Sequence, residues 1–134
     1  MKRIFWVVLA GALVTGGCGD PEVPTLPTPA VPTITDTFSD TLLVLGSNTH
    51  TFSVDGTGGV KVRLTSVEPS AVVRIGIGFP SLGSCSVIDQ ALATPSPDVL
   101  LSGTAMIRGL FCVSISDVGN LVEPVAYTIN VLHS

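Results

Sequence analysis

The feature that most limits the fold of this chain is a two-residue alternation of apolar and polar side chains. It is cleanest at 60–65, where Val, Val and Leu alternate with Lys, Arg and Thr. Successive side chains of a β-strand point to opposite faces, so such a run predicts a strand with one buried row. The runs with this pattern are 49–54, 60–65, 72–79, 111–116 and 125–132.

Turn-forming residues separate these runs, as at 46–48, 55–59, 68–70 and 117–120. Residues 37–45 form a further, mixed run of β-formers, and 99–101 open another short strand. We expect 80–97 to be mostly loop, with a short extended piece at 86–88. No run has helical periodicity, so the pattern predicts a single all-β domain, either a sandwich or a barrel.

The first seventeen residues have the composition of an export signal. Lys2 and Arg3 precede an apolar run from Ile4 to Val14, and the small residues Thr15, Gly16 and Gly17 follow it. This run is shorter than the roughly 20 apolar residues of a membrane-spanning helix. We therefore expect a cleaved signal helix at 1–17.

Cys18, directly after these small residues, resembles the lipobox cysteine of bacterial lipoproteins, although Thr15 stands where that family usually has Leu. The resemblance implies that the Cys18 thiol carries diacylglycerol and that the new N-terminus carries a fatty acyl group such as palmitate. Two or more acyl chains give a stable membrane anchor. Gly19, in place of Asp, implies sorting to the outer membrane by analogy with Gram-negative lipoproteins. The alternatives are an ordinary cleaved signal with a free cysteine, or an uncleaved anchor.

A proline-rich stretch follows Cys18. Residues 20–35 hold five of the ten prolines of the chain, and proline can neither donate to a sheet ladder nor continue a helix. We expect residues 18–35 to be an anchored, disordered linker that is extended like polyproline and acts as a spacer. A ligand for a proline-recognising module, through the PxxP matches at 21–24 and 24–27, is the alternative.

The charge balance excludes one class of partner. Removal of Lys2 and Arg3 with the signal leaves four basic and ten acidic residues, a formal charge of −6. Nucleic-acid binding depends on Lys and Arg that neutralise phosphates, and no basic cluster exists here. The expected partners are instead a membrane, through the lipid anchor, and an unidentified exported protein or envelope component.

Four segments together resemble the bacterial pre-peptidase C-terminal domain: 49–54 (THTFSV), 60–64 (VKVRL), 109–115 (GLFCVSI) and 127–131 (YTINV). The resemblance covers about residues 37–133. It implies a jelly-roll-like β-sandwich at 36–134, of a kind usually appended to secreted proteases, where it takes part in substrate or matrix binding and in secretion. Some members bind calcium, but the acidic middle strand common in that family is replaced here by 70–79, which contains no acid.

Cys85 and Cys112 are the two cysteines that remain once Cys18 is acylated. An even number of cysteines in an exported domain predicts a disulfide. Cys112 lies on the outer row of its predicted strand, where a cysteine from the 80–97 loop can reach it. Two separate buried thiols are the alternative.

The remaining candidates for chemistry are sparse. His50 lies on the apolar row of its run, and we interpret it as a residue at the end of a strand. His133 lies beside the C-terminus. Two histidines do not supply the three or four His or Cys ligands of a zinc site. Ser84 does not fit the G-x-S-x-G nucleophile pattern. All mature aromatics but Phe38 fall on inward rows, which disfavours a sugar-stacking platform.

Calcium takes six to eight oxygen ligands, and five acids beside predicted turns or strand ends are weak candidates. They are Asp36, Asp40, Asp55, Asp117 and Glu123.

We therefore expect a lipid-anchored protein of the bacterial cell envelope, in the periplasm or on the surface, with a non-catalytic binding or structural β-sandwich. No catalytic residues and no cofactor are expected. The first alternative is a calcium-stabilised accessory module of a secreted hydrolase. The second is a small hydrolase whose site, with Ser84 or Asp89, lies in the 80–97 loop.

Overall fold

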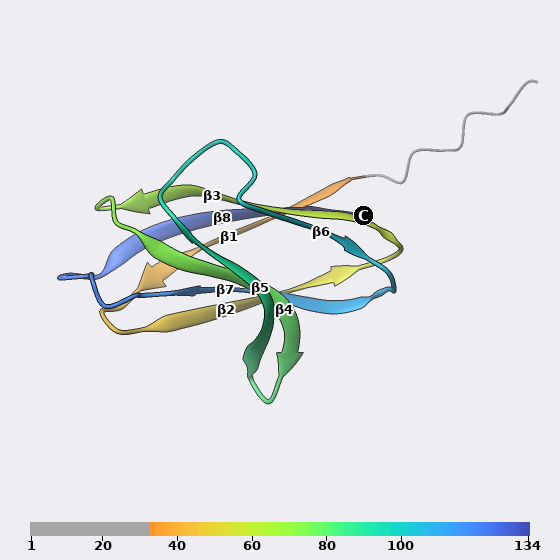
Figure 1. Ribbon diagram of the computed structural model, residues 1–134, viewed down its shortest axis with the longest axis horizontal. Coiled ribbons are helices and arrows are strands. Elements are labelled where there is room, and N and C mark those ends of the chain that lie inside the picture. Colours follow the sequence, from red (N-terminus) through yellow and green to blue (C-terminus); the bar gives the residue numbers. More distant parts are fainter. Residues whose placement is uncertain (1–32) are drawn as a thin grey trace, which may run out of the picture. The chain divides into compact units, whose positions relative to one another are not determined.

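Residues 33–134 are described by a computed structural model and form two antiparallel four-stranded sheets that pack face to face (Figure 1). The expected all-β class and β-sandwich are confirmed. Within these residues no helix is long and apolar enough to cross a membrane. The expected signal helix and the linker up to residue 32 lie outside the described residues.

The strands of residues 33–134 are β1 (Ile34–Leu42), β2 (Ser47–Val54), β3 (Gly58–Glu68), β4 (Val73–Ser81), β5 (Ser84–Ala93), β6 (Leu101–Ala105), β7 (Gly109–Ser116) and β8 (Val125–His133). β1 begins at Ile34, two residues before the predicted start of the domain at 36. It ends at Leu42 and not at Leu45, because residues 43–46 turn the chain through a hydrogen bond from the Gly46 N–H to the Leu43 carbonyl.

The strand order is that of a jelly roll. One sheet has the order β1-β8-β3-β6 and the other β2-β7-β4-β5. The chain crosses between the sheets at every connection except the β4–β5 hairpin, which gives the double Greek key of that fold. The jelly-roll arrangement implied by the family resemblance is therefore present.

The alternating runs form the core as predicted. Their apolar rows face inward between the sheets, and most of these side chains are buried. β8 shows the pattern most clearly, with Val125, Tyr127, Ile129 and Val131 buried and the residues between them partly or fully exposed. Burial of such rows supplies about 25 cal/mol per Å² of apolar area and holds the two sheets together.

Two sequence expectations about this part are wrong. Residues 80–97 are not mostly loop, because β4 continues to Ser81 and β5 is a ten-residue strand. Phe38 lies on an inward row of β1 and packs against the core, whereas the sequence placed it outside. Phe79 is on an inward row as predicted, with its ring 5.0 Å from that of Phe111, but it stays 42% exposed.

β5 pairs with β4 at the edge of the sheet, and its first residues also lie close against the outer face of β4 around Gly76 and Gly78. This face of β4 has both a bulge and a close neighbouring strand. The β4–β5 register shifts between Ile77 and Gly78. A Cβ on Gly78 would overlap the Ser86 carbonyl, and a Cβ on Gly76 would lie 2.8 Å from Ser114 Oγ. Glycine at both positions therefore lets the hairpin fold closely over its own sheet.

The two ends of the sandwich carry different connections. The entry end carries the start of β1, the β2–β3 turn, the β6–β7 loop and the C-terminus (Figure 1). The opposite end carries the β1–β2 turn at 43–46 and the β7–β8 loop at 117–124.

Candidate functional site

Polar side chains gather on inward rows at one side of the sandwich, where the edge strands β1 and β2 lie over one another. We call this group the polar seam, and it consists of Asp36, Asp40, Asn48, His50, Tyr127 and His133. Polar groups in such a half-buried position need hydrogen-bond partners, because an unpaired one costs about 1–3 kcal/mol.

The centre of the seam joins the two sheets. His50 Nε2 on β2 lies 2.6 Å from the Tyr127 hydroxyl on β8. The Asn48 amide donates to the same hydroxyl at 3.0 Å and to the Thr41 carbonyl at 2.9 Å. Since the Tyr127 oxygen already accepts from Asn48, the consistent arrangement has its O–H donating to a neutral His50 ring.

The titration properties fit this arrangement. Burial lowers the pKa of His50 from its usual value of 6.5, and the nearby Asp40 carboxylate opposes this shift. Burial also raises the pKa of the Tyr127 phenol from 10.0. Both groups are therefore neutral near pH 7, and the hydrogen bond between them is one between uncharged partners.

Aromatic and carboxylate contacts complete the seam. The Phe38 ring stacks on the His50 ring, with centroids 4.9 Å apart and planes inclined by 12°. His133 donates from Nε2 to the Asp36 carboxylate at 2.7 Å, and its ring lies 5.1 Å from that of Phe52 on the other sheet. The seam is thus a satisfied network that links β1, β2 and β8.

Two members of the seam are almost completely closed to solvent. Tyr127 and His133 are each 2% exposed. In the described part of the chain, the two histidine rings contact the Tyr127 hydroxyl, the Asp36 carboxylate and the Ser134 backbone carbonyl, and neither is hydrogen-bonded to a serine hydroxyl or a cysteine thiol. Among residues 33–134, no group of three or more His, Cys, Asp or Glu could hold a metal ion. The arrangement is suited to holding the edge strands together.

Sequence reasoning missed the seam for an identifiable reason. His50 does lie on the apolar row as predicted, but in the middle of β2 and not at its end. Asp36 and Asp40 lie within β1 on its inward row, whereas the sequence pattern placed them beside turns or strand ends. The sequence did contain one indication: Asp36, Phe38 and Asp40 are spaced two residues apart, which places both acids on the same face of the strand as the aromatic ring.

Asp117 closes the opposite end of the sandwich. Its Oδ2 accepts the Leu45 N–H at 2.8 Å, and its Oδ1 accepts the N–H groups of Gly119, Asn120 and Leu121 at 2.8, 3.1 and 3.2 Å. These hydrogen bonds lower the pKa of Asp117 from 3.8, and the bond from the Leu45 N–H has the largest effect. Burial opposes the shift with a smaller effect. Its oxygens are thus used in joining two loops.

The other calcium candidates are dispersed. Asp36 is bound to His133, Asp40 accepts from the Thr41 N–H at 2.7 Å, and Asp55 and Glu123 are exposed in the β2–β3 and β7–β8 connections. Asp55 and Glu123 thus belong to opposite ends of the sandwich. The structure does not bring the five acids together.

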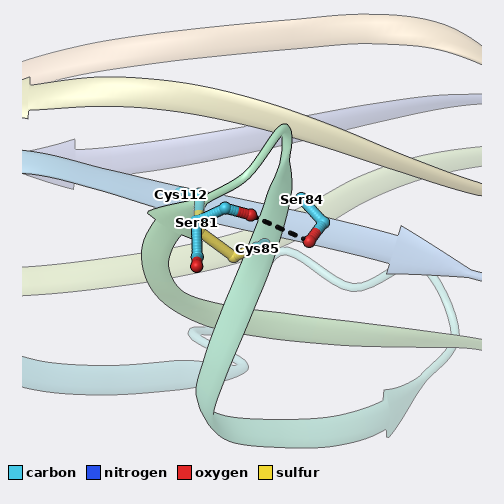
Figure 2. The surroundings of a disulfide bond; sticks show 4 residues. All are labelled: Ser81, Ser84, Cys85 and Cys112. Atoms are coloured by element: carbon cyan, nitrogen blue, oxygen red, sulfur yellow. Dashed lines mark hydrogen bonds between the residues drawn. A yellow bond between two sulfur atoms is a disulfide. The ribbon is translucent and has the colours of Figure 1, made fainter.

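The predicted disulfide is confirmed. Cys85 at the start of β5 is bonded to Cys112 on β7, with Cα atoms 5.8 Å apart (Figure 2). Cys112 pairs with Gly78 on the outer row of its sheet, as expected, but Cys85 comes from a strand and not from a loop. The bond ties the tip of the β4–β5 hairpin to the sheet that it covers.

The residues proposed for a small hydrolase are not assembled. Ser84 Oγ donates to the Ser81 carbonyl at 3.0 Å within the hairpin turn (Figure 2). Asp89 lies five residues further along β5, about 16 Å away at the usual rise per residue. It borders a cavity of about 120 Å³ between β5 and β6 that is otherwise lined mainly by apolar residues such as Ile77, Ile88 and Phe111.

Cys18, the predicted lipidation site, lies outside the described residues. No family model matches the chain, and no curated protein matches it.

Proposed function

We propose that this chain is an exported bacterial lipoprotein, held by acyl chains on Cys18 at a cell-envelope membrane, whose jelly-roll domain binds another component without catalysing a reaction. The membrane is proposed to be the outer one. In this proposal the domain serves the same kind of role as the pre-peptidase C-terminal domains that it resembles: contact with a protein or an envelope polymer outside the cytoplasm.

The Cys85–Cys112 disulfide is the observation that carries the proposal. Structural disulfides persist in oxidising compartments and are rare in the cytosol, so the pair supports export. Of the three cysteines of the chain, Cys18 is the one outside this disulfide, and it stands directly after a signal-like segment. Export and a cysteine in that position are what a lipid anchor requires.

The closed character of the polar seam supports a binding role over catalysis. Its histidines are engaged inside the sandwich, with Tyr127 and with Asp36. The exposed side chains that could contact a partner instead include large apolar ones at both ends and on the hairpin, such as Leu45, Leu82 and Ile107.

Acyl-chain labelling in bacterial cells tests the anchor. The full chain, the C18S variant and a C85S/C112S control are expressed with a clickable fatty acid. We expect label on the wild type and the control, and none on C18S. Label retained on C18S would refute the anchor assignment.

Crosslinking on intact cells, followed by capture through a C-terminal tag, tests the binding role. One exported protein recovered above the level of a tagged C18S control would identify the partner and support the proposal. Recovery of envelope polymer alone would identify that polymer as the component contacted, and recovery of neither a protein nor a polymer above the control would contradict the binding role.

A further inference from the structure

The entry end of the sandwich presents a short apolar loop. Residues 106–108 connect β6 to β7, and Met106 and Ile107 are 75% and 67% exposed. Leu110, at the start of β7, is 59% exposed. Single exposed apolar side chains are common, but these three lie within five consecutive residues and form a group of the kind found at contact sites for proteins or membranes.

This loop lies at the end where the chain enters the domain (Figure 1). Ile34 pairs with His133 at one edge of this end, and Gly58 pairs with Ala105, the last residue before the loop. The Asp55 N–H donates to the Ser134 carbonyl at 3.1 Å, which connects the β2–β3 turn to the C-terminus. The loop and the start of β1 therefore belong to one end of the same domain.

The length of the preceding chain favours a membrane contact at this end. Fifteen residues, 19–33, separate Cys18 from β1, and they span about 47 Å at most in a polyproline-like conformation. β1 has nine residues, so the sandwich is about 30 Å long in the strand direction. The entry end can reach the lipid surface with a slack linker, whereas the opposite end requires most of the linker to run back along the domain.

The charges of the entry end do not favour electrostatic binding. Arg108 lies in the loop beside Ile107, but the acidic residue Asp55 belongs to the same end. Attraction to anionic lipids requires a cluster of basic residues. Contact with a membrane here would therefore depend on the apolar side chains.

We infer that the entry end docks on the lipid surface that holds the anchor, with Met106 and Ile107 inserted at the boundary between headgroups and acyl chains. This inference depends on the proposed acylation of Cys18. The acyl chains supply the membrane affinity, and the loop determines which end of the domain faces the bilayer. The opposite end, with Leu45 and Val122, then points away from the membrane and remains available to a partner.

Tryptophan quenching by brominated lipid tests the orientation. The only tryptophan of the chain is Trp6, in the signal, so the mature protein contains none. I107W places a probe on the loop, and V122W places a matched control on the opposite end, where Val122 is 92% exposed. Each acylated full-length variant is incorporated into phosphatidylethanolamine–phosphatidylglycerol vesicles with and without brominated chains.

The expected result is strong quenching of the tryptophan at 107, little quenching at 122, and no change between low and high salt. Vesicle-bound protein with equal quenching at both positions, or stronger quenching at 122, would overturn the docking while leaving the anchor intact. Quenching lost at high salt would overturn the apolar mode of contact. Protein that fails to float with the vesicles would overturn the anchor, and the inference with it.

Discussion

His50 on β2 and Tyr127 on β8 join the two sheets of the sandwich through a hydrogen bond of 2.6 Å between the imidazole Nε2 and the phenolic oxygen. The bond lies near an open side of the sandwich, where the edge strands β1 and β2 have no further strand beside them within residues 33–134. A hydrogen bond at this place fixes how the two edge strands align. Apolar contacts alone would determine this alignment less strictly, because they are not directional.

Removal of the Tyr127 hydroxyl should weaken the fold. Y127F keeps the ring but leaves the Asn48 amide and the His50 ring without their shared partner, so we expect the free energy of unfolding to fall by about 1–3 kcal/mol. Urea denaturation measures this. S39A is the matched control, since it removes an exposed hydrogen bond of 3.0 Å to Thr128 and should change stability by less than about 0.5 kcal/mol. Equal stability of Y127F and wild type would contradict the role of the seam.

Stability should decrease in mildly acidic solution because of His50. Its folded pKa is lowered by burial from 6.5, against the opposing effect of Asp40. Between the folded pKa and 6.5 the unfolded state therefore binds more protons, and stability falls as pH drops below about 6.5. Thermal melts from pH 7.5 to 5 on wild type and H50Q measure the effect. The decrease should be smaller in H50Q, and identical pH profiles would refute the assignment to His50.

Asp117 should hold the two loops of the opposite end in place. D117A removes the acceptor of four backbone N–H groups, so we expect a lower melting temperature and faster amide exchange at Leu45, whose N–H is one of the four. D117N keeps one carbonyl oxygen and should fall between D117A and wild type. Because the folded pKa of Asp117 is lowered from 3.8, the stabilisation is present above pH 3.8 and is lost as pH falls through the folded value. Unchanged exchange at Leu45 in D117A would contradict this.

A methyl group at Gly78 should disrupt the hairpin that the disulfide ties down. The added Cβ would overlap the Ser86 backbone, and overpacking of this kind costs about 1–3 kcal/mol or more. G78A should therefore unfold at lower urea concentration and show more free thiol from Cys85 and Cys112. G103A, on the edge strand β6, meets nothing within 4 Å and serves as the control, with stability equal to wild type or higher. A stable, fully oxidised G78A would show that β5 does not lie close over β4.

The strands that could be predicted from the sequence are those with one buried and one exposed face. Residues 60–65 and 125–132 alternate because β3 and β8 each have an inward row in the core. Of β5, only the extended piece at 86–88 was predicted. The rest was missed because β5 is an exposed edge strand over most of its length, and an exposed strand has no apolar row to reveal it. The disulfide could be predicted from the cysteine count and the outer-row position of Cys112.

The polar seam could not be predicted, since its partners are far apart in the chain. Asp36 and His133 are 97 residues apart, and His50 and Tyr127 are 77 apart. Local patterns describe which face a side chain occupies but not which side chain lies opposite it. The register of β1 against β8, which brings Asp36 beside His133, follows from the whole arrangement of the sheets.

The mass of the mature N-terminal peptide tests the central claim most directly. The protein is purified in detergent from bacterial membranes, digested and analysed by mass spectrometry. The proposal predicts a peptide that begins at Cys18 and carries a diacylglycerol thioether with a further acyl group on its amine. A mature chain that begins elsewhere, or that contains an unmodified Cys18, would contradict it.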